Sequence, residues 1–145
     1  MSGFFLALAM LAAQPAPTSA PTSSPVPSAA EDLAFTSWAI IEINGVAVAP
    51  ANYAYSLDLG ENGFLGYSRC NRFSGRFASA EGRLDLGLIG ATENPCPPPH
   101  DRLDAQLRRV LSGAAGPVRV SLPDADTMLL TADIAIRLRR KPGGS

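Results

Sequence analysis

The chain has 145 residues, of which 46% are hydrophobic and 17% are charged, and its formal net charge at pH 7 is −1. This length and composition are typical of one globular domain with a core of its own. All 12 Lys and Arg residues lie at Arg69 or later, but the nearly neutral total charge and the lack of a recognised module argue against a nucleic-acid partner.

The N-terminal part of the chain divides into two segments. The apolar run Phe4–Ala13 has the length of a signal-peptide core and is too short to span a bilayer, so residues 1–13 are predicted to be a secretory signal cleaved after Ala13. Residues 14–33 are mostly Pro, Ala, Ser and Thr and are predicted to form a disordered tether. No cysteine precedes Cys70 to carry a lipid. We therefore expect a periplasmic or secreted protein with no transmembrane span in the mature chain, tethered to the membrane only if the signal is uncleaved.

Residues 34–141 are predicted to form the folded domain, which begins with short strands. Asn44-Gly45 is the strongest two-residue hairpin signal and follows an apolar, β-branched run, so 37–48 is predicted to be a hairpin. Residues 53–59 alternate, with Tyr53, Tyr55, Leu57 and Leu59 on one face. Similar patterns predict further strands at 64–67, 70–77, 83–89, 118–122, 128–131 and 134–138.

One helix is predicted in the second half of the domain. The run Pro95–Pro99 excludes regular structure, and apolar residues then recur at helical spacing over 101–111, with Gly113 after the end. Within the strands, Gly75 is expected to mark a bulge or a close backbone approach. The predicted fold class is α+β, with a curved and mainly antiparallel sheet and one helix packed on it.

Two strings around the cysteines are distinctive: Cys70-Asn71-Arg72-Phe73-Ser74-Gly75, and Thr92-Glu93-Asn94-Pro95-Cys96. Together with the strand at Trp38 and the Asn44-Gly45 turn, they resemble the META-domain family, the HslJ-like heat-shock-associated proteins of bacterial envelopes. The resemblance covers about residues 35–140 and implies an incomplete barrel with its helix over one opening. It also implies a role in stress tolerance through contact with another envelope component. The chain departs from the family pattern at Arg69 and just before Cys96, in both cases in loops.

The two cysteines are predicted to form a disulfide. An exported protein meets an oxidising compartment, and Cys70 and Cys96 are 26 positions apart. Closing such a loop stabilises a protein by roughly 3.5 kcal/mol in the chain-entropy account. The alternative is a metal site made of Cys70, Cys96 and His100, but no fourth ligand is apparent. No metal or cofactor is therefore predicted.

Other candidate chemical groups are weak. His100 is the only histidine and lies beside prolines, and Ser74 lacks the surrounding glycines of a nucleophile elbow. Glu61 and Glu81 can be drawn as a carboxylate pair, but each lies next to a turn. The sequence predicts no catalytic residue, and we expect a protein that is not an enzyme.

A surface strip for binding an anion or a partner is the remaining candidate site, made of Asn71, Arg72 and Arg76. The two arginines fall on the same side of an extended strand, with Phe73 and Phe77 on the other. Ordinary amphipathic alternation is the preferred explanation of the arginines, and a turn-stabilising role is the preferred explanation of Asn71.

The functional prediction is a monomeric, non-enzymatic envelope protein that binds another protein or a lipid component of the envelope. The alternative is a carrier or pilot-like chaperone that holds a small apolar ligand, such as a lipid, inside an open barrel; this rests on analogy of fold. The two functions predict different barrel interiors: side chains packed to ordinary density leave no room for a ligand, whereas an apolar cavity favours a carrier. The side chains that decide this are Leu57, Phe64, Phe73, Leu84, Leu86 and Leu107.

Overall fold

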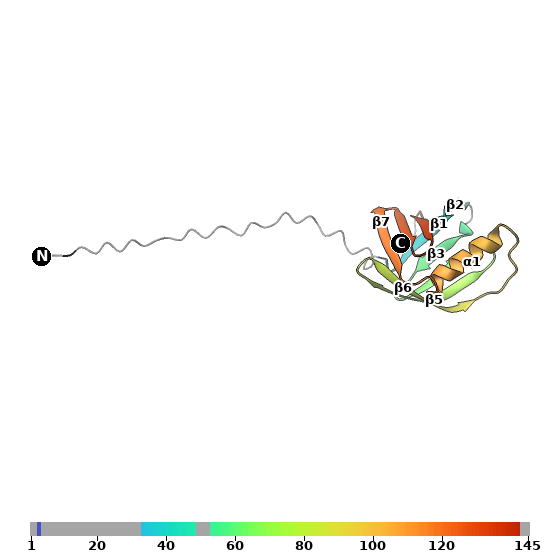
Figure 1. Cartoon of the computed structure of the whole chain (residues 1–145), viewed down its shortest axis with the longest axis horizontal. Helices are drawn as coiled ribbons and strands as arrows, with labels where there is room; N and C mark the ends of the chain where they lie inside the picture. The colour runs from blue at the N-terminus through green and yellow to red at the C-terminus, as the bar shows by residue number, and fades with distance from the viewer. Residues whose placement is uncertain (1–2, 4–32, 49–52, 143–145) are drawn as a thin grey trace.

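The computed structural model describes residues 3, 33–48 and 53–142. The described part contains one α-helix and a series of short strands (Figure 1). In chain order these elements are β1 Thr36–Ile43, β2 Val46–Ala47, β3 Ser56–Leu59, β4 Gly63–Tyr67, β5 Arg72–Ala80, β6 Arg83–Ala91, α1 His100–Leu111, β7 Val118–Asp124, β8 Thr127–Thr131 and β9 Ala135–Arg140.

The sheet closes on itself to form a barrel. Strands β1 and β3 to β9 follow one another in antiparallel pairs, and β9 then pairs with β1, while β2 adds to β1 as a short extension. In the closing pair Trp38 lies opposite Arg140 and Ile43 opposite Ile136. The α+β class and the antiparallel sheet are confirmed, but the predicted incomplete barrel is wrong. Closure removes the exposed edges that β1 and β9 would otherwise present to other chains.

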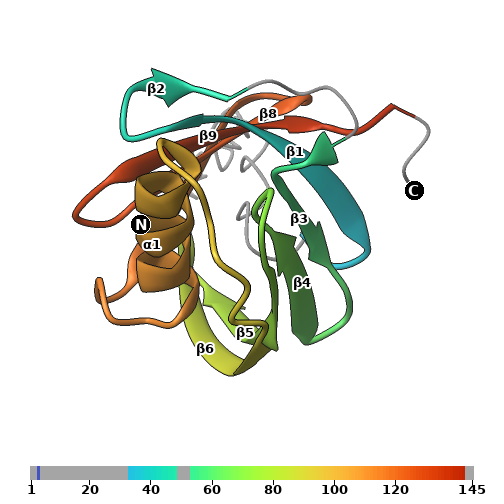
Figure 2. The same ribbon diagram turned by 90° about the vertical axis from the view of Figure 1, so that its right-hand side faces the viewer.

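The ladder between β6 and β7 is the shortest in the ring. It contains two pairs, Arg83 with Arg119 and Leu84 with Val118. The helix α1 lies at one end of the barrel, near β5 and β6 (Figures 1 and 2). Its buried apolar residues complete the core at that end, and they are Leu103, Leu107, Val110 and Leu111.

Gly75 on β5 lies where a neighbouring strand and the ring of Phe64 leave no room for a side chain. A Cβ atom added there would lie 2.2 Å from the carbonyl oxygen of Gly87 and 2.6 Å from the ring of Phe64. The β5–β6 register also shifts between Ser74 and Gly75. The sequence prediction of a bulge or a close approach at this glycine is therefore confirmed in both respects.

The first hairpin agrees with the prediction, but the strand after it is shorter than expected. Asn44 and Gly45 have φ angles of 48° and 79°, as the predicted tight turn requires. Strand β3 begins only at Ser56. Tyr53, predicted to share one face of the strand with Tyr55 and Leu57, has a φ of 50° and is 42% exposed. The ammonium of Lys141 lies 5.2 Å from its ring centroid. Its left-handed backbone lies outside the extended range, so the predicted alternation is wrong at Tyr53.

The folded domain begins earlier than predicted. Leu33, expected to be the last residue of the tether, is fully buried, and its carbonyl oxygen accepts a 2.5 Å hydrogen bond from the hydroxyl of Thr36. The tether prediction is therefore wrong for Leu33, because this side chain completes the core. The rest of the predicted tether, and the predicted signal apart from Gly3, lie outside the described residues. Within the described part of the chain, no helix combines the length and the apolar character that a bilayer crossing needs.

Candidate functional site

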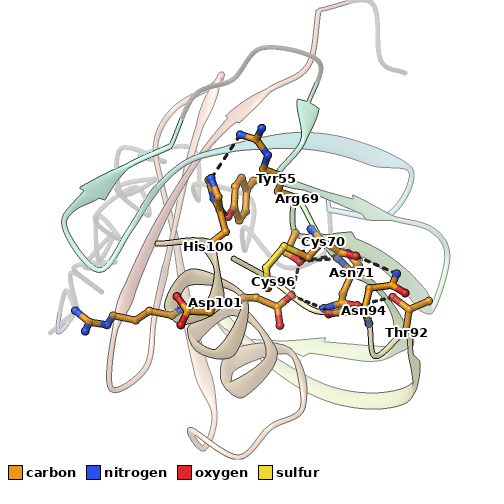
Figure 3. Close-up of a disulfide and its surroundings, with 12 residues drawn as sticks. Tyr55, Arg69, Cys70, Asn71, Thr92, Asn94, Cys96, His100 and Asp101 are labelled. Carbon is orange, nitrogen blue, oxygen red and sulfur yellow. Dashed lines mark hydrogen bonds between the residues drawn. A yellow bond between two sulfur atoms is a disulfide. The ribbon is translucent and has the colours of Figure 1, made fainter. Parts of the chain in front are cut away.

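The disulfide lies where the barrel wall meets the start of the helix. Cys70 lies in the loop between β4 and β5, and Cys96 lies in the proline-rich loop that leads to α1. The two cysteines are joined, with their Cα atoms 5.4 Å apart (Figure 3). The predicted disulfide is thus present, and it holds a loop with little regular hydrogen bonding against the wall.

Beside the disulfide lies Asn71, which is buried, with 5% of its surface exposed. Its amide oxygen accepts hydrogen bonds from the Thr92 hydroxyl at 2.9 Å and from the backbone N–H of Asn94 at 2.7 Å. Its amide nitrogen donates to the Asn94 carbonyl oxygen at 3.2 Å and to Oδ1 of Asp104 at 3.1 Å. Both polar ends of the side chain are therefore satisfied inside the protein (Figure 3).

Asp104 on α1 is a second buried polar residue of this network, with 7% of its surface exposed. Its Oδ1 atom accepts hydrogen bonds from the hydroxyl of Ser68 and from the amide of Asn71. Its Oδ2 atom lies 3.9 Å from the guanidinium of Arg108, one helical turn further on. Two hydrogen-bond donors and a nearby positive charge therefore compensate the burial of this carboxylate.

Arg108 connects this network to the loop before Cys96. Its guanidinium donates to the carbonyl oxygen of Thr92 at 3.2 Å and to the carboxylate of Glu93 at 2.8 Å. It also lies 5.2 Å from the centroid of the Phe73 ring, within range for a cation–π contact. Ser68, Asn71, Thr92, Asn94, Asp104 and Arg108 thus form one connected group, which we call the loop-anchoring network.

A smaller cluster of polar groups lies on the other side of the disulfide. The hydroxyl of Tyr55 is 2.7 Å from Nδ1 of His100, and Nε2 of His100 is 3.4 Å from the guanidinium of Arg69 (Figure 3). Burial raises the pKa of Tyr55 above its ordinary value; the Asp104 carboxylate adds to the rise and the Arg69 guanidinium opposes it. At neutral pH Tyr55 is therefore a protonated hydrogen-bonding group.

The structure separates the residues of the predicted surface strip. Arg72 and Arg76 are both exposed on β5, whereas Phe73 and Phe77 are buried on the opposite side of the strand. Asn71 belongs to the buried network, so its assignment to an exposed strip is wrong; its hydrogen bonds favour the turn-stabilising interpretation instead. A binding role for the two arginines stays a prediction.

The alternative chemical sites are not assembled. Both sulfur atoms are used in the disulfide, which removes two of the three ligands of the alternative metal site. Among the described residues, no three His, Cys, Asp or Glu side chains are grouped closely enough to hold a metal ion. Ser74 is half-buried within β5, and Glu61 and Glu81 are exposed in different turns.

The sequence analysis did not recognise the loop-anchoring network as a unit. Asn71, Thr92 and Asn94 all lie in the two strings that carried the family resemblance. Asp104 was not among the candidate site residues of the sequence analysis. The available signal was its position: Asp104 lies on the same face of the helix as the buried apolar residues Leu103 and Leu107.

Comparison with known proteins places this fold in a family. The family model described as META domain matches residues 31–142. The chain belongs to the META-domain family. No significant match to this META-domain protein was found among curated proteins.

Two solved structures resemble this META-domain protein. One is the NMR structure of a protein from Burkholderia xenovorans, which is 22% identical, with a TM-score of 0.60, over 80% of this chain and 88% of that chain. The other is an NMR structure of a protein that is 24% identical, with a TM-score of 0.59, over 75% of this chain and 92% of that chain. At these identities the likeness concerns the fold.

Proposed function

We propose that this META-domain protein is an exported, non-enzymatic protein of the bacterial cell envelope that contributes to stress tolerance by binding another envelope component. It acts as a monomer in the periplasm or outside the cell. The observation that carries this proposal is the Cys70–Cys96 disulfide at the junction of wall and helix. Disulfides of this kind persist in oxidising compartments and are rare in the bacterial cytosol.

The hydrogen bonding of the polar groups near the disulfide supports a non-enzymatic role. Asn71 and Asp104 make their hydrogen bonds to other groups of the protein and are almost fully buried. A catalytic acid, base or nucleophile must instead reach a substrate. These residues therefore serve the fold, and we assign no catalytic residue.

The barrel interior argues against a ligand carrier. Six side chains distinguish a ligand carrier from a protein that binds through its surface, and each of them has at most 9% of its surface exposed. They are Leu57, Phe64, Phe73, Leu84, Leu86 and Leu107. Three of the surface hollows in the described part of the chain are lined by other residues, and by none of these six. The interior is occupied by the protein's own side chains, so we favour contact through the outer surface.

The outer face of β4, β5 and β6 is our candidate contact surface. Arg72 and Arg76 are exposed there, and neither forms an ion pair with another described residue. Two large apolar residues accompany them: Leu65 on β4 is 42% exposed and Ile89 on β6 is 69% exposed. Apolar side chains beside unpaired arginines fit a partner that presents acidic and apolar groups together.

The proposal is tested in a strain that lacks the gene and expresses either the wild type or the double variant Arg72→Glu with Arg76→Glu. A matched control carries Arg102→Glu with Arg137→Glu, two exposed arginines on other elements. We expect the first variant, but not the control, to lose survival under envelope stress, and we expect the wild type to fractionate with the periplasm or medium without free thiols. A cytoplasmic protein with two alkylatable thiols, or full survival with the strip variant, would overturn the proposal.

A further inference from the structure

Two arginines face each other where β6 meets β7. The ladder at this place has only two residue pairs, and one of them places Arg83 directly opposite Arg119. Directly opposed like charges destabilise a strand pair. The barrel therefore has a repulsive contact within its shortest ladder, which an anion between the two side chains would relieve.

The charges on these arginines are only partly balanced by the protein. Arg83 lies 3.8 Å from the carboxylate of Asp85, but both side chains are more than half exposed, so this pair is weak. Arg119 is exposed and forms no ion pair with any other residue that the structure describes. The guanidinium of Arg119 is therefore available to an anion from solution.

A surface hollow of about 660 Å³ lies at the same place, and both arginines line it. Ser121 on β7 and Thr131 on β8 also line the hollow, and Thr131 is the cross-strand partner of Arg119. The register thus aligns Arg83, Arg119 and Thr131 across three strands. Gly82 leaves the rim without a side chain.

We propose that this hollow binds a phosphate group. Two guanidinium groups offer several N–H donors in planar forks, and the hydroxyls of Ser121 and Thr131 can add two more. A tetrahedral dianion uses more of these donors than a carboxylate with two oxygen atoms. The site lies on β6, β7 and β8 and does not depend on the proposed function, which uses β4, β5 and the β6 residue Ile89.

Glu81 limits the affinity of this site. Glu81 lies in the turn between β5 and β6 and also lines the hollow. Its carboxylate forms no ion pair with Arg83 or Arg119. A negative charge at the rim repels an incoming anion. Replacing Glu81 by Gln should therefore strengthen phosphate binding, which a purely structural role of the arginines would not cause.

The test is a calorimetric titration of the full chain with inorganic phosphate, with ionic strength held constant by sodium chloride. We expect saturable binding at one site. Arg119→Gln should weaken the affinity about tenfold, because it removes about one charge-assisted hydrogen bond. Arg137→Gln removes the same charge from an exposed arginine outside the hollow and should leave the affinity unchanged. Absence of binding, or equal losses in the two variants, would overturn the proposal.

Thermal unfolding gives a second readout that is independent of affinity. Without phosphate, Arg119→Gln should unfold at the same temperature as the wild type or a higher one, because it removes the repulsion with Arg83. With phosphate, the wild type should gain more than the variant, because a ligand that binds the folded state stabilises it. A variant destabilised equally under both conditions would show that Arg119 serves only the fold.

The phosphate group can belong to a soluble molecule or to a lipid headgroup, and vesicles distinguish these sources. If the source is a lipid, the protein should sediment with vesicles that contain phosphatidic acid, whose headgroup is a phosphate monoester, and both free phosphate and Arg119→Gln should release it. If the source is soluble, free phosphate should bind while the protein stays in the supernatant. If the protein does not bind free phosphate and Arg119→Gln sediments with the vesicles as much as the wild type does, both sources are excluded and the proposal is wrong.

Discussion

The side-chain amide of Asn71 donates a 3.1 Å hydrogen bond to Oδ1 of Asp104, although 33 positions separate the two residues. This contact joins the loop after β4 to the first turns of α1. The Cys70–Cys96 disulfide joins the same loop to the segment just before the helix. A covalent link and a buried polar link thus hold one junction together.

Replacing Asn71 by Ala should lower the free energy of unfolding by about 2 to 4 kcal/mol, because it leaves buried partners of the amide without hydrogen bonds. Urea denaturation of the oxidised protein measures this loss. The neighbouring Arg72 is exposed, so Arg72→Ala is the matched control and should change stability by less than about 0.5 kcal/mol. Equal effects of the two substitutions would contradict the role assigned to Asn71.

Asp104 should tolerate replacement by Asn much better than replacement by Leu. Asn retains an oxygen that can accept the hydrogen bonds from Ser68 and Asn71, so Asp104→Asn should cost about 1 kcal/mol. Leu removes the acceptor and leaves two buried donors unpaired, so Asp104→Leu should cost about 3 kcal/mol or more. The comparison is made by urea denaturation at neutral pH. A more stable Leu variant would show that the network is not required for stability.

Removing the disulfide by Cys70→Ala with Cys96→Ala should lower stability by roughly 3.5 kcal/mol, in the chain-entropy account of a closed loop of this length. The measurement is urea denaturation of the double variant beside the wild type. The wild type with a strong reductant is the control and should approach the variant, since both lack the same bond. If the variant and the oxidised wild type unfold at the same urea concentration, the disulfide does not stabilise the junction.

The local parts of the fold were predictable because each depends on neighbouring residues. Asn44-Gly45 determines its own turn, and the spacing of Leu103 and Leu107 indicates which face of the helix is buried. Barrel closure was not predictable in the same way, because β1 and β9 pair across most of the domain and nothing local to Trp38 specifies Arg140 as its partner. The same limit applies to the site. Cys70 and Cys96 could be paired because they are the only cysteines, whereas the burial of Asp104 depends on where the helix docks.

The packing at Gly75 should make this position intolerant even of one methyl group. A Cβ there would lie 2.2 Å from a backbone oxygen that cannot turn aside. Gly75→Ala should therefore cost about 3 kcal/mol or more, or prevent folding. Gly87 on the paired strand is the matched control, because a Cβ there meets no atom within 4 Å, and Gly87→Ala should be neutral or stabilise by about 0.5 kcal/mol. Thermal unfolding measures both variants: Gly75→Ala should unfold at a lower temperature than the wild type, and Gly87→Ala should not. Equal unfolding temperatures of the two variants would contradict the close packing at Gly75.

Tyr55 should make stability depend on alkaline pH. Its phenol is buried and its pKa is raised, so the folded protein holds this proton more tightly than the unfolded chain does. The stabilisation is fully present below the unfolded pKa of about 10 and is lost as the pH rises through the higher folded value. Above about pH 10, unfolding therefore releases a proton, and the free energy of unfolding should fall as the pH rises.

The variant Tyr55→Phe separates this titration from the packing of the ring. At neutral pH it should be about 1 kcal/mol less stable than the wild type, because it loses the hydrogen bond to His100. Above about pH 10 the difference should shrink, since the variant has no phenol to ionise there. Urea denaturation at neutral and alkaline pH measures both, with Tyr53→Phe as a control that removes an exposed hydroxyl and should follow the wild type. A difference between wild type and Tyr55→Phe that stays constant up to high pH would mean that the Tyr55 phenol ionises as easily in the folded protein as in the unfolded chain.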